Sequence, residues 1–581
     1  MLKKLIKSIR EYKKETILTP IFVALEVVLE VIIPFLMAKL IDEGVYNVDI
    51  NMVYKIALEL IICTLLSLLF GILSGIYASK AGAGFAKNLR QDLYFKVQDF
   101  SFSNIDKFST SSLVTRLTTD VSSIQNAFQI IIRIAVRAPL MLVISLVFAI
   151  TISLKLSLVF LILVPLLGLG LYLIIYKVHP LMKRIFKTYD KLNNVVEENI
   201  SGIRVVKSFV IEENEKKKFR DVSNGIYKDF SKAEKIIAIN NPLMQFSLYI
   251  CILLISWFGA KIIINTRMTE LTTGELMTMF AYSIQILSSL IMFSISLVMM
   301  ILSKASGERI VEVLEEVPDI KNIKNKIDEL KDGSIDFNNV SFSYINNKDK
   351  ECLKKINLSI KSGETVGILG GTGSGKSSLV NLIPRLYDVT EGELLVGGIN
   401  VKEYDIKSLR NEVACVLQKN VLFSGTINDN IRWGNEKATN EDIKRVCKLA
   451  QADEFISEFP NGYDTIIEEG GTNVSGGQKQ RLCIARALLK RPKILILDDS
   501  TSAVDTKTDS LIQKVLKDEI PNTTKLIIAQ RISSIENCDK IIVMNNGEVN
   551  GIGAHKELLK SNKIYKEVYE SQMKGNYANE E

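Results

Sequence analysis

The chain has 581 residues, of which 47% are hydrophobic, 72 are basic and 65 are acidic. A chain of this length buries a large core over two or three domains, which excludes a small fold held together by disulfides. The net charge of +7 is low for the length and does not favour a nucleic-acid partner. The seven cysteines form no C-x-x-C pair, so we expect a reducing compartment and neither a disulfide framework nor a zinc site.

Six long apolar runs occupy the first half of the chain. Five carry no charged residue and the first carries Glu26 and Glu30; the runs cover residues 16–38, 60–79, 138–154, 156–176, 236–260 and 276–302. A helix needs about 20 apolar residues to cross the hydrocarbon core of a bilayer. Each run is therefore predicted to be a membrane-spanning helix.

The pattern changes after residue 303. A charged segment with a helix break predicted at Pro318 comes first, and short β-branched runs then alternate with amphipathic helices, which is typical of an α/β fold. We predict a multidomain protein with an all-α transmembrane domain of six spans followed by an α/β domain. The predicted boundaries are 1–303 for the transmembrane domain, 304–333 for a linker, 334–572 for the α/β domain and 573–581 for a polar tail.

Basic residues predict the orientation of the spans. The amino-terminal segment and the connections 80–137 and 177–235 are rich in lysine and arginine, whereas only acidic charges lie between Lys39 and Lys55. Because lysine and arginine mark cytoplasmic loops, we expect a multi-pass protein of the cell membrane with both termini in the cytoplasm. The first span lacks a signal-peptide cleavage site and is expected to be retained.

The two cytoplasmic connections are too long to be simple loops. Apolar residues at helical spacing over 85–100 and 189–206 predict helices that extend the spans beyond the bilayer as rods. Short polar turns near 102–112 and 210–218 are expected at the tips of these rods, where they would contact a cytoplasmic domain.

A glycine-rich segment follows the predicted strand 364–369 and precedes a helix. It matches G-x-x-x-x-G-K-[ST] in the strand–loop–helix context that this motif requires. In such a loop the backbone N–H groups surround a β-phosphate, Lys376 reaches the β- and γ-phosphates, and the Ser377 hydroxyl holds magnesium. The predicted nucleotide-binding residues are Gly370, Gly371, Thr372, Gly373, Ser374, Gly375, Lys376, Ser377 and Ser378.

A carboxylate ends a second buried strand about 120 residues later. The run 494–497 is apolar and Asp498 follows it directly. This is the expected position of a second magnesium ligand in a phosphate-loop NTPase. An aspartate at the end of a parallel strand is common, so Asp498 becomes informative only together with the loop.

The sequence Val474-Ser475-Gly476-Gly477-Gln478 precedes a predicted helix at 482–489. It resembles the signature motif of ABC transporter ATPases, which implies that its amides and serine bind the γ-phosphate of ATP held by a second subunit. The resemblance also implies that Tyr344 stacks on adenine and that Gln418 contacts magnesium and senses the membrane domain. Residues 502–505, with Asp505, resemble the D-loop that faces the partner, and 468–471 resembles the X-loop of exporters.

The order of the parts extends this resemblance to nearly the whole chain. Six spans followed by one ATPase domain resemble an ABC exporter half-transporter, which implies ATP and Mg²⁺ as cofactors, the lipid bilayer and a second half-transporter as partners, and alternating access as the mechanism. The expected cargo is a drug or another small amphipathic substrate. A homodimeric lipid or drug flippase with slow ATPase, or a nucleotide-gated regulatory subunit, remain alternatives.

Two positions depart from the family pattern. The glutamate that polarises the attacking water is replaced by Asp499, and the switch histidine is replaced by Gln530; the only histidines, His179 and His555, lie elsewhere. Aspartate is one methylene shorter, and glutamine cannot relay a proton. The combination resembles the degenerate-site subunit of heterodimeric bacterial multidrug exporters, which implies slow hydrolysis in this chain's own site and a signature that completes the partner's site.

Two acidic residues lie within the first span. Glu26 and Glu30 are one helical turn apart, and Pro34 follows. Intramembrane carboxylates are costly, so Glu30 is a candidate for contact with a cationic substrate. Pairing with Arg133 or Arg137 is the structural alternative, and it is favoured for Glu26.

Overall fold

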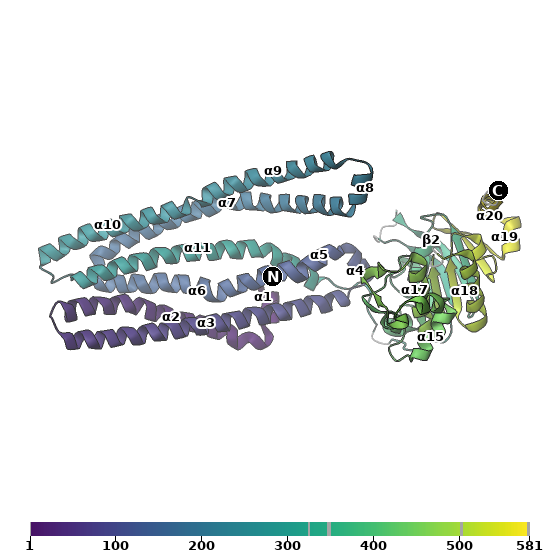
Figure 1. Ribbon diagram of the computed structural model, residues 1–581, viewed down its shortest axis with the longest axis horizontal. Helices are drawn as coiled ribbons and strands as arrows, with labels where there is room; N and C mark the ends of the chain where they lie inside the picture. Colours follow the sequence, from purple (N-terminus) through teal and green to yellow (C-terminus); the bar gives the residue numbers. More distant parts are fainter. Residues whose placement is uncertain (1, 324–325, 345–349, 500–503, 578–581) are drawn as a thin grey trace. The chain divides into compact units, whose positions relative to one another are not determined.

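The computed structural model describes residues 2–323, 326–344, 350–499 and 504–577. The chain divides into two compact units (Figure 1). The first comprises Met1–Gln98 and Ser109–Glu316 and is helical. The second comprises Asp99–Phe108 and Val317–Glu581 and is an α/β domain that includes one short segment from the helical half of the sequence.

Six helices in the described part of the chain are long and apolar enough to cross a membrane. Their bounds are α2 Lys13–Lys39, α3 Ile50–Gln98, α6 Val121–Ile152, α7 Leu154–Ser201, α10 Asn240–Thr266 and α11 Thr273–Glu315. Each overlaps one of the six predicted apolar runs; the run 138–154 extends two residues past α6, and the run 236–260 begins four residues before α10. The predicted fold class, six long apolar helices followed by an α/β domain, is therefore confirmed.

A proline in α2 accounts for the way α11 packs against it. Pro34 has no backbone N–H, so the carbonyl of Glu30, four residues earlier, lacks its usual helical donor. The side chain of Gln285 supplies one, with Nε2 3.2 Å from Glu30 O. Tyr282 donates to Val31 O at 3.0 Å, and Thr278 donates to Pro34 O at 2.7 Å. The three donors lie at helical spacing on one face of α11 and join it to α2.

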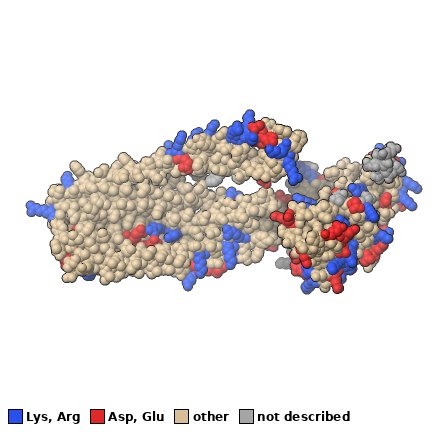
Figure 2. Space-filling view, viewed as in Figure 1, with Lys and Arg blue, Asp and Glu red and all other residues tan. Residues whose placement is uncertain are grey.

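The rods beyond the spans are helical, as the sequence predicts, but the second tip lies elsewhere than expected. Residues 202–211 form this tip, with the short helix α8 (Ile203–Ser208), and α9 (Glu212–Ile237) begins within the predicted turn 210–218. Acidic side chains in the first turn of α9 favour a helix start there. Figure 2 shows acidic and basic side chains gathered over this end of the α7–α9 hairpin.

The first tip forms two short helices instead of a plain turn, α4 (Phe102–Lys107) and α5 (Thr110–Thr115). A capping box between Ser101 and Asn104 starts α4. Within the second unit, Ser103 donates to Asp319 at 2.7 Å and Asn104 donates to the carbonyl of Val317 at 3.2 Å. These two hydrogen bonds fix α4 to residues 317–319, where the main segment of the α/β unit begins.

The helix predicted before the break at Pro318 is present. Residues 304–315, the first part of the predicted linker segment 304–333, continue α11 to Glu315. Ile310 is buried, and Arg309 pairs with Asp120 while Arg116 pairs with Glu312. These contacts stabilise the helix up to the region where Pro318 disfavours its continuation.

The α/β unit is built on two sheets. The larger has the order β12-β11-β3-β10-β9-β6, with β12 antiparallel at one edge and the other five strands parallel. Its strands are β3 Thr365–Gly370, β6 Val413–Val416, β9 Ile494–Asp498, β10 Thr524–Ile528, β11 Lys540–Asn545 and β12 Glu548–Gly553. The smaller sheet is antiparallel, with the order β2-β1-β4-β5: β1 Ile335–Phe342, β2 Leu353–Ile360, β4 Glu391–Val396 and β5 Ile399–Asn400. A two-stranded ribbon pairs β7 Gly425–Thr426 with β8 Ile466–Ile467.

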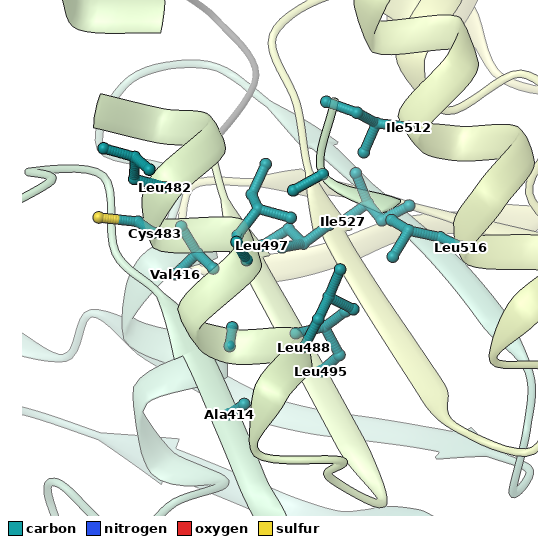
Figure 3. Close-up of a cluster of buried hydrophobic side chains, with 14 of the residues drawn as sticks. Ala414, Val416, Leu482, Cys483, Leu488, Leu495, Leu497, Ile512, Leu516 and Ile527 are labelled. Atoms are coloured by element: carbon teal, nitrogen blue, oxygen red, sulfur yellow. The ribbon is translucent and has the colours of Figure 1, made fainter. Parts of the chain in front are cut away.

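Alternating side chains of the parallel strands build two cores. On β9, Leu495 and Leu497 face one core and Ile494 and Ile496 the other. In Figure 3 the first core lies between the sheet and the helices α17 (Gly476–Leu489) and α18 (Thr506–Glu519). The remaining helices of this unit are α12 Lys376–Leu382, α13 Ile406–Glu412, α14 Ile427–Arg432, α15 Asn440–Leu449, α16 Asp453–Glu458, α19 His555–Ser561 and α20 Lys563–Tyr577.

Candidate nucleotide site

The glycine-rich loop joins the end of β3 to the start of α12. Gly373 and Gly375 have φ of 79° and 96°, in the left-handed region that side chains disfavour. A Cβ at Gly375 would lie 2.8 Å from the carbonyl oxygen of Cys352. Both the backbone conformation and the lack of space therefore require glycine at position 375. The loop passes close to the backbone of Cys352 just before α12 begins.

Lys376 folds back over this loop. Its Nζ donates to the carbonyl oxygens of Gly370 and Gly371, each at 2.8 Å. Burial lowers the pKa of Lys376, and the nearby carboxylates of Asp498 and Asp499 act against that shift. The ammonium group thus lies at the loop, where it donates to neutral carbonyl oxygens. Phosphate oxygens, which are anionic and form stronger hydrogen bonds with an ammonium group, can replace them.

Asp498 lies beside the loop because its strand does. β9 pairs in parallel with β10, which pairs in parallel with β3, so the carboxyl ends of these strands meet at one sheet edge. Burial raises the pKa of Asp498, while a hydrogen bond with the Ser377 side chain lowers it. The structure therefore brings together two of the three side chains that the sequence predicts as magnesium ligands.

The donor set of this pair suits Mg²⁺. A hydroxyl and a carboxylate are hard oxygen ligands, and Mg²⁺ is usually bound by one or two protein carboxylates together with substrate phosphates. Within the described ranges, no group of three or more His, Cys, Asp or Glu residues could hold a metal by itself. Gln418, the third predicted ligand, is exposed two residues after β6, which pairs with β9 at the same sheet edge.

Asp499 and Gln530 contact each other directly. Gln530 Nε2 donates to Asp499 Oδ2 at 2.9 Å. Burial raises the pKa of Asp499, whereas this hydrogen bond and the charges of Lys376 and Arg531 lower it. Asp499 has a φ of 49°, and its N–H donates to Ile528 O at 3.0 Å. The two residues that depart from the family pattern therefore form one pair at the end of β9.

Aromatic side chains surround the predicted adenine contact. Tyr344 is 44% exposed, and its hydroxyl lies 2.9 Å from Ser378 Oγ in α12. Its ring centroid lies 5.0 Å from that of Tyr387 and 4.8 Å from that of Phe342. Tyr387 was not predicted as a site residue: it is 43 positions away in sequence, and its role in this cluster arises from tertiary packing alone.

The signature residues form a helix N-terminus. Ser475 caps α17 in a capping box with Gln478, whose Oε1 accepts from Ser475 N at 2.9 Å. Ser475 and Gly476 are exposed, and no hydrogen bond joins the signature to the glycine-rich loop in the part of the chain that is described.

Asp505 of the predicted D-loop caps α18. The hydrogen bonds of this cap lower the pKa of its carboxyl. Ser502 and Ala503 of the same loop lie outside the described residues.

In the membrane unit, Arg137 joins the two acidic residues of α2. Its guanidinium donates to Glu26 and, at 2.5 Å, to Glu30 Oε2. The Glu26 side chain is 12% exposed and that of Glu30 is 35% exposed. Ser74 lies 3.4 Å from Glu26 Oε2. The ion pairing that the sequence analysis raised as an alternative is therefore present for both residues, through Arg137.

Together the features define a membrane protein whose six spans share one chain with a nucleotide-binding domain. The family description "ABC transporter transmembrane region" matches residues 16–290, and "ABC transporter" matches residues 353–502. The chain is 36% identical over 547 residues to the uncharacterized ABC transporter ATP-binding protein YfiB of Bacillus subtilis (strain 168), covering 94% of each chain. It is 31% identical over 548 residues to the ATP-dependent lipid A-core flippase of Syntrophus aciditrophicus (strain SB), covering 94% of this chain and 90% of that protein.

A solved structure shares the fold. A bacterial Atm1-family ABC exporter with ATP bound superposes with a TM-score of 0.83 at 24% identity, covering 97% of this chain and 98% of the other. The chain belongs to the ABC transporter family. It is a half-transporter, with one membrane domain and one ATP-binding domain on the same chain, in which ATP hydrolysis is coupled to transport, and such a half dimerises with another ABC half.

Proposed function

We propose that this chain is the slowly hydrolysing half of a heterodimeric ABC exporter. The contact between Asp499 and Gln530, 2.9 Å between Oδ2 and Nε2, is the observation that carries the proposal. It joins the two substituted positions: the Asp499 carboxylate accepts a hydrogen bond from the Gln530 amide beside the glycine-rich loop.

The chemistry of this pair supports slow hydrolysis. Aspartate at position 499 ends about 1 to 1.5 Å short of a glutamate, and a misplacement on the order of 1 Å can cost about 100-fold in rate. An oxygen that already accepts from Gln530 is a weaker base for the attacking water. Gln530 can donate a hydrogen bond to a γ-phosphate but cannot pass on a proton. ATP would therefore bind well and be cleaved slowly.

The glycine-rich loop and the neighbouring strand ends support ATP binding. The loop from Gly370 to Ser378 would surround the phosphates and Tyr344 would stack on adenine. Ser377, Asp498 and Gln418 would hold Mg²⁺, which would neutralise charge on the phosphate oxygens. The hydrogen bond between Ser377 and Asp498 supports their sharing one ion.

The signature at the N-terminus of α17, where Ser475 and Gly476 are exposed, would complete the partner's site. Val474, Ser475, Gly476, Gly477 and Gln478 would meet the γ-phosphate of ATP held by the partner half, with Asp505 facing the same interface. The partner is expected to have glutamate and histidine at the positions that match Asp499 and Gln530. Hydrolysis there would reset a cycle of alternating access across the cell membrane, with both termini of this chain in the cytoplasm.

Purification of the full-length chain in native detergent tests the heterodimer. A second, different ABC half should co-purify, and ATPase activity should be weak for this chain alone and normal for the pair. Near-normal turnover by a homodimer of this chain would contradict the proposal.

The cargo is proposed to be a drug or another small amphipathic compound. The half-exposed Glu30 is a candidate contact for a cationic cargo. Similarity to a lipid A-core flippase supports a lipid as the second candidate. ATP-dependent uptake of a cationic dye into inverted vesicles, compared with that of a labelled lipid, distinguishes these cargoes. A regulatory subunit without pumping activity would give neither signal.

A further inference from the structure

The side-chain amide of Gln572 in α20 forms two hydrogen bonds with the loop that carries Gln530. Its Nε2 donates to the backbone carbonyl of Gln530 at 2.8 Å, and its Oε1 accepts from the backbone N–H of Ile532 at 2.9 Å. The side-chain amide thus pairs with backbone groups on both sides of Arg531. The bond to Gln530 requires a donor and the bond to Ile532 requires an acceptor, which fixes the orientation of the amide.

The helix that presents Gln572 is anchored in the core of the α/β unit. Tyr565 is fully buried, and its hydroxyl lies 2.7 Å from His555 Nδ1. Val568 and Tyr569 pack against the same core, which also contains Ile532. Positions 565, 568, 569 and 572 follow helical spacing, so Gln572 lies on the buried face of α20. Packing of α20 therefore fixes the backbone at position 572, and the two hydrogen bonds hold the amide.

The same loop is fixed from two further directions. Ser534 donates to Asp509 of α18 at 2.6 Å, and Gln530 donates to Asp499 at the end of β9. The backbone of residues 530–532 lies beyond the end of β10 and has no strand partner there. Gln572 supplies the hydrogen bonds that such a backbone otherwise lacks, and so determines where the Gln530 side chain points.

We propose that Gln572 is a positioning residue for ATP hydrolysis in this chain's own site, acting through Gln530. The proposal rests on the proposed function only in assigning Gln530 to the hydrolytic step, as a hydrogen-bond donor to the γ-phosphate whose loss costs more rate than the release of Asp499 restores. Tyr344 and the glycine-rich loop do not contact α20 by any hydrogen bond within the described ranges, so loss of Gln572 should slow cleavage and leave ATP affinity unchanged.

The test is a double-mutant cycle in the full-length chain, with Q572A, Q530A and the combined variant. Single-turnover hydrolysis of ATP and equilibrium binding of a fluorescent ATP analogue separate cleavage from affinity. Q572A should reduce cleavage about tenfold with affinity unchanged, and the combined variant should be no slower than Q530A, because both changes act on one step. Additive losses, or a loss of affinity equal to the loss of rate, would overturn the proposal.

Two further variants keep this result interpretable. Q572E retains the acceptor for Ile532 N–H but replaces the donor to Gln530 O, so it should match Q572A in rate while Ile532 stays protected from hydrogen exchange. E567A is the matched control, because it removes only an exposed pair with Lys563 on the same helix. Unchanged exchange at Ile532 in Q572A would overturn the contact itself. Fast turnover by the wild-type chain would contradict the proposed slow site but leave the cycle between Gln572 and Gln530 measurable.

Discussion

Tyr387 donates a hydrogen bond from its hydroxyl to Asp106 Oδ2 at 2.7 Å. Its ring also lies 6.0 Å from Phe102 and 5.0 Å from Tyr344. One side chain thus connects α4, which the sequence assigns to the first cytoplasmic tip of the membrane domain, with the predicted adenine contact. Within the second unit this is a continuous path from α4 to the nucleotide site.

Replacing Tyr387 with phenylalanine should weaken coupling without weakening ATP binding. Y387F removes the hydrogen bond to Asp106 but keeps the ring against Tyr344. Dye uptake per ATP hydrolysed should fall several-fold, whereas binding of a fluorescent ATP analogue should not change. Y404F is the matched control, because the Tyr404 hydroxyl makes a similar bond, 2.8 Å to Val396 O, away from α4. An equal loss of coupling in both variants would contradict the role of Asp106.

Restoring the family residues in this chain's own site should restore hydrolysis. Combining D499E with Q530H lengthens the carboxylate and supplies a group that can relay a proton. ATP turnover of the full-length chain alone should rise by about 100-fold, as expected for correcting an error on the order of 1 Å. D499N combined with Q530A should show no rise. If the restored variant is no faster than wild type, these two residues do not limit turnover.

The features that could be predicted from the sequence are those that depend on a short stretch of chain, such as the length of an apolar run or the backbone conformation of a turn. Bilayer thickness sets the length of each span, so each of the six apolar runs coincides with most of one long helix. The glycine-rich loop was predictable because its backbone conformation needs glycine at Gly375. The ion pairs Arg309–Asp120 and Arg116–Glu312 near the end of α11 were not predictable, since they join residues nearly 200 positions apart. The same applies to Tyr387 and Gln572, whose contacts exist only once the domain is folded.

Arg137 should be essential for the stability of the membrane unit. It donates to both Glu26 and Glu30, so R137A leaves two carboxylates without their common partner. Removing one member of a buried ion pair costs about 3–5 kcal/mol, and we expect R137A to lower the thermal midpoint in detergent strongly. Adding E26Q and E30Q to R137A should recover most of the loss. No recovery would show that Arg137 acts through packing rather than charge.

The two glutamates should differ in export. Glu30 is the more exposed, and E30Q should reduce uptake of a cationic dye while ATPase activity remains. E26Q is the matched control in the same ion-pair group and should leave uptake unchanged. Equal effects of both variants would favour a purely structural role for the group.

Gly375 should tolerate no side chain. G375A places a methyl group 2.8 Å from Cys352 O at a φ of 96°, which should cost about 1–3 kcal/mol of unfolding free energy. G371A is the control, because nothing lies within 4 Å of a Cβ there. Thermal unfolding of the nucleotide-free protein measures both effects, and equal midpoints for the two variants would contradict the argument.

The charge of Asp499 should destabilise the nucleotide-free protein at neutral pH. Burial is the largest influence on Asp499 and raises its pKa above the usual value of 3.8. Between that value and the higher folded pKa, the folded state binds more protons than the unfolded state, so stability falls as pH rises through this window. D499N removes the charge and should raise the thermal midpoint at pH 7.5. The gain should shrink as pH falls through the raised pKa of the wild-type carboxyl, because that carboxyl then loses its charge as well; a gain independent of pH would instead indicate a change in packing.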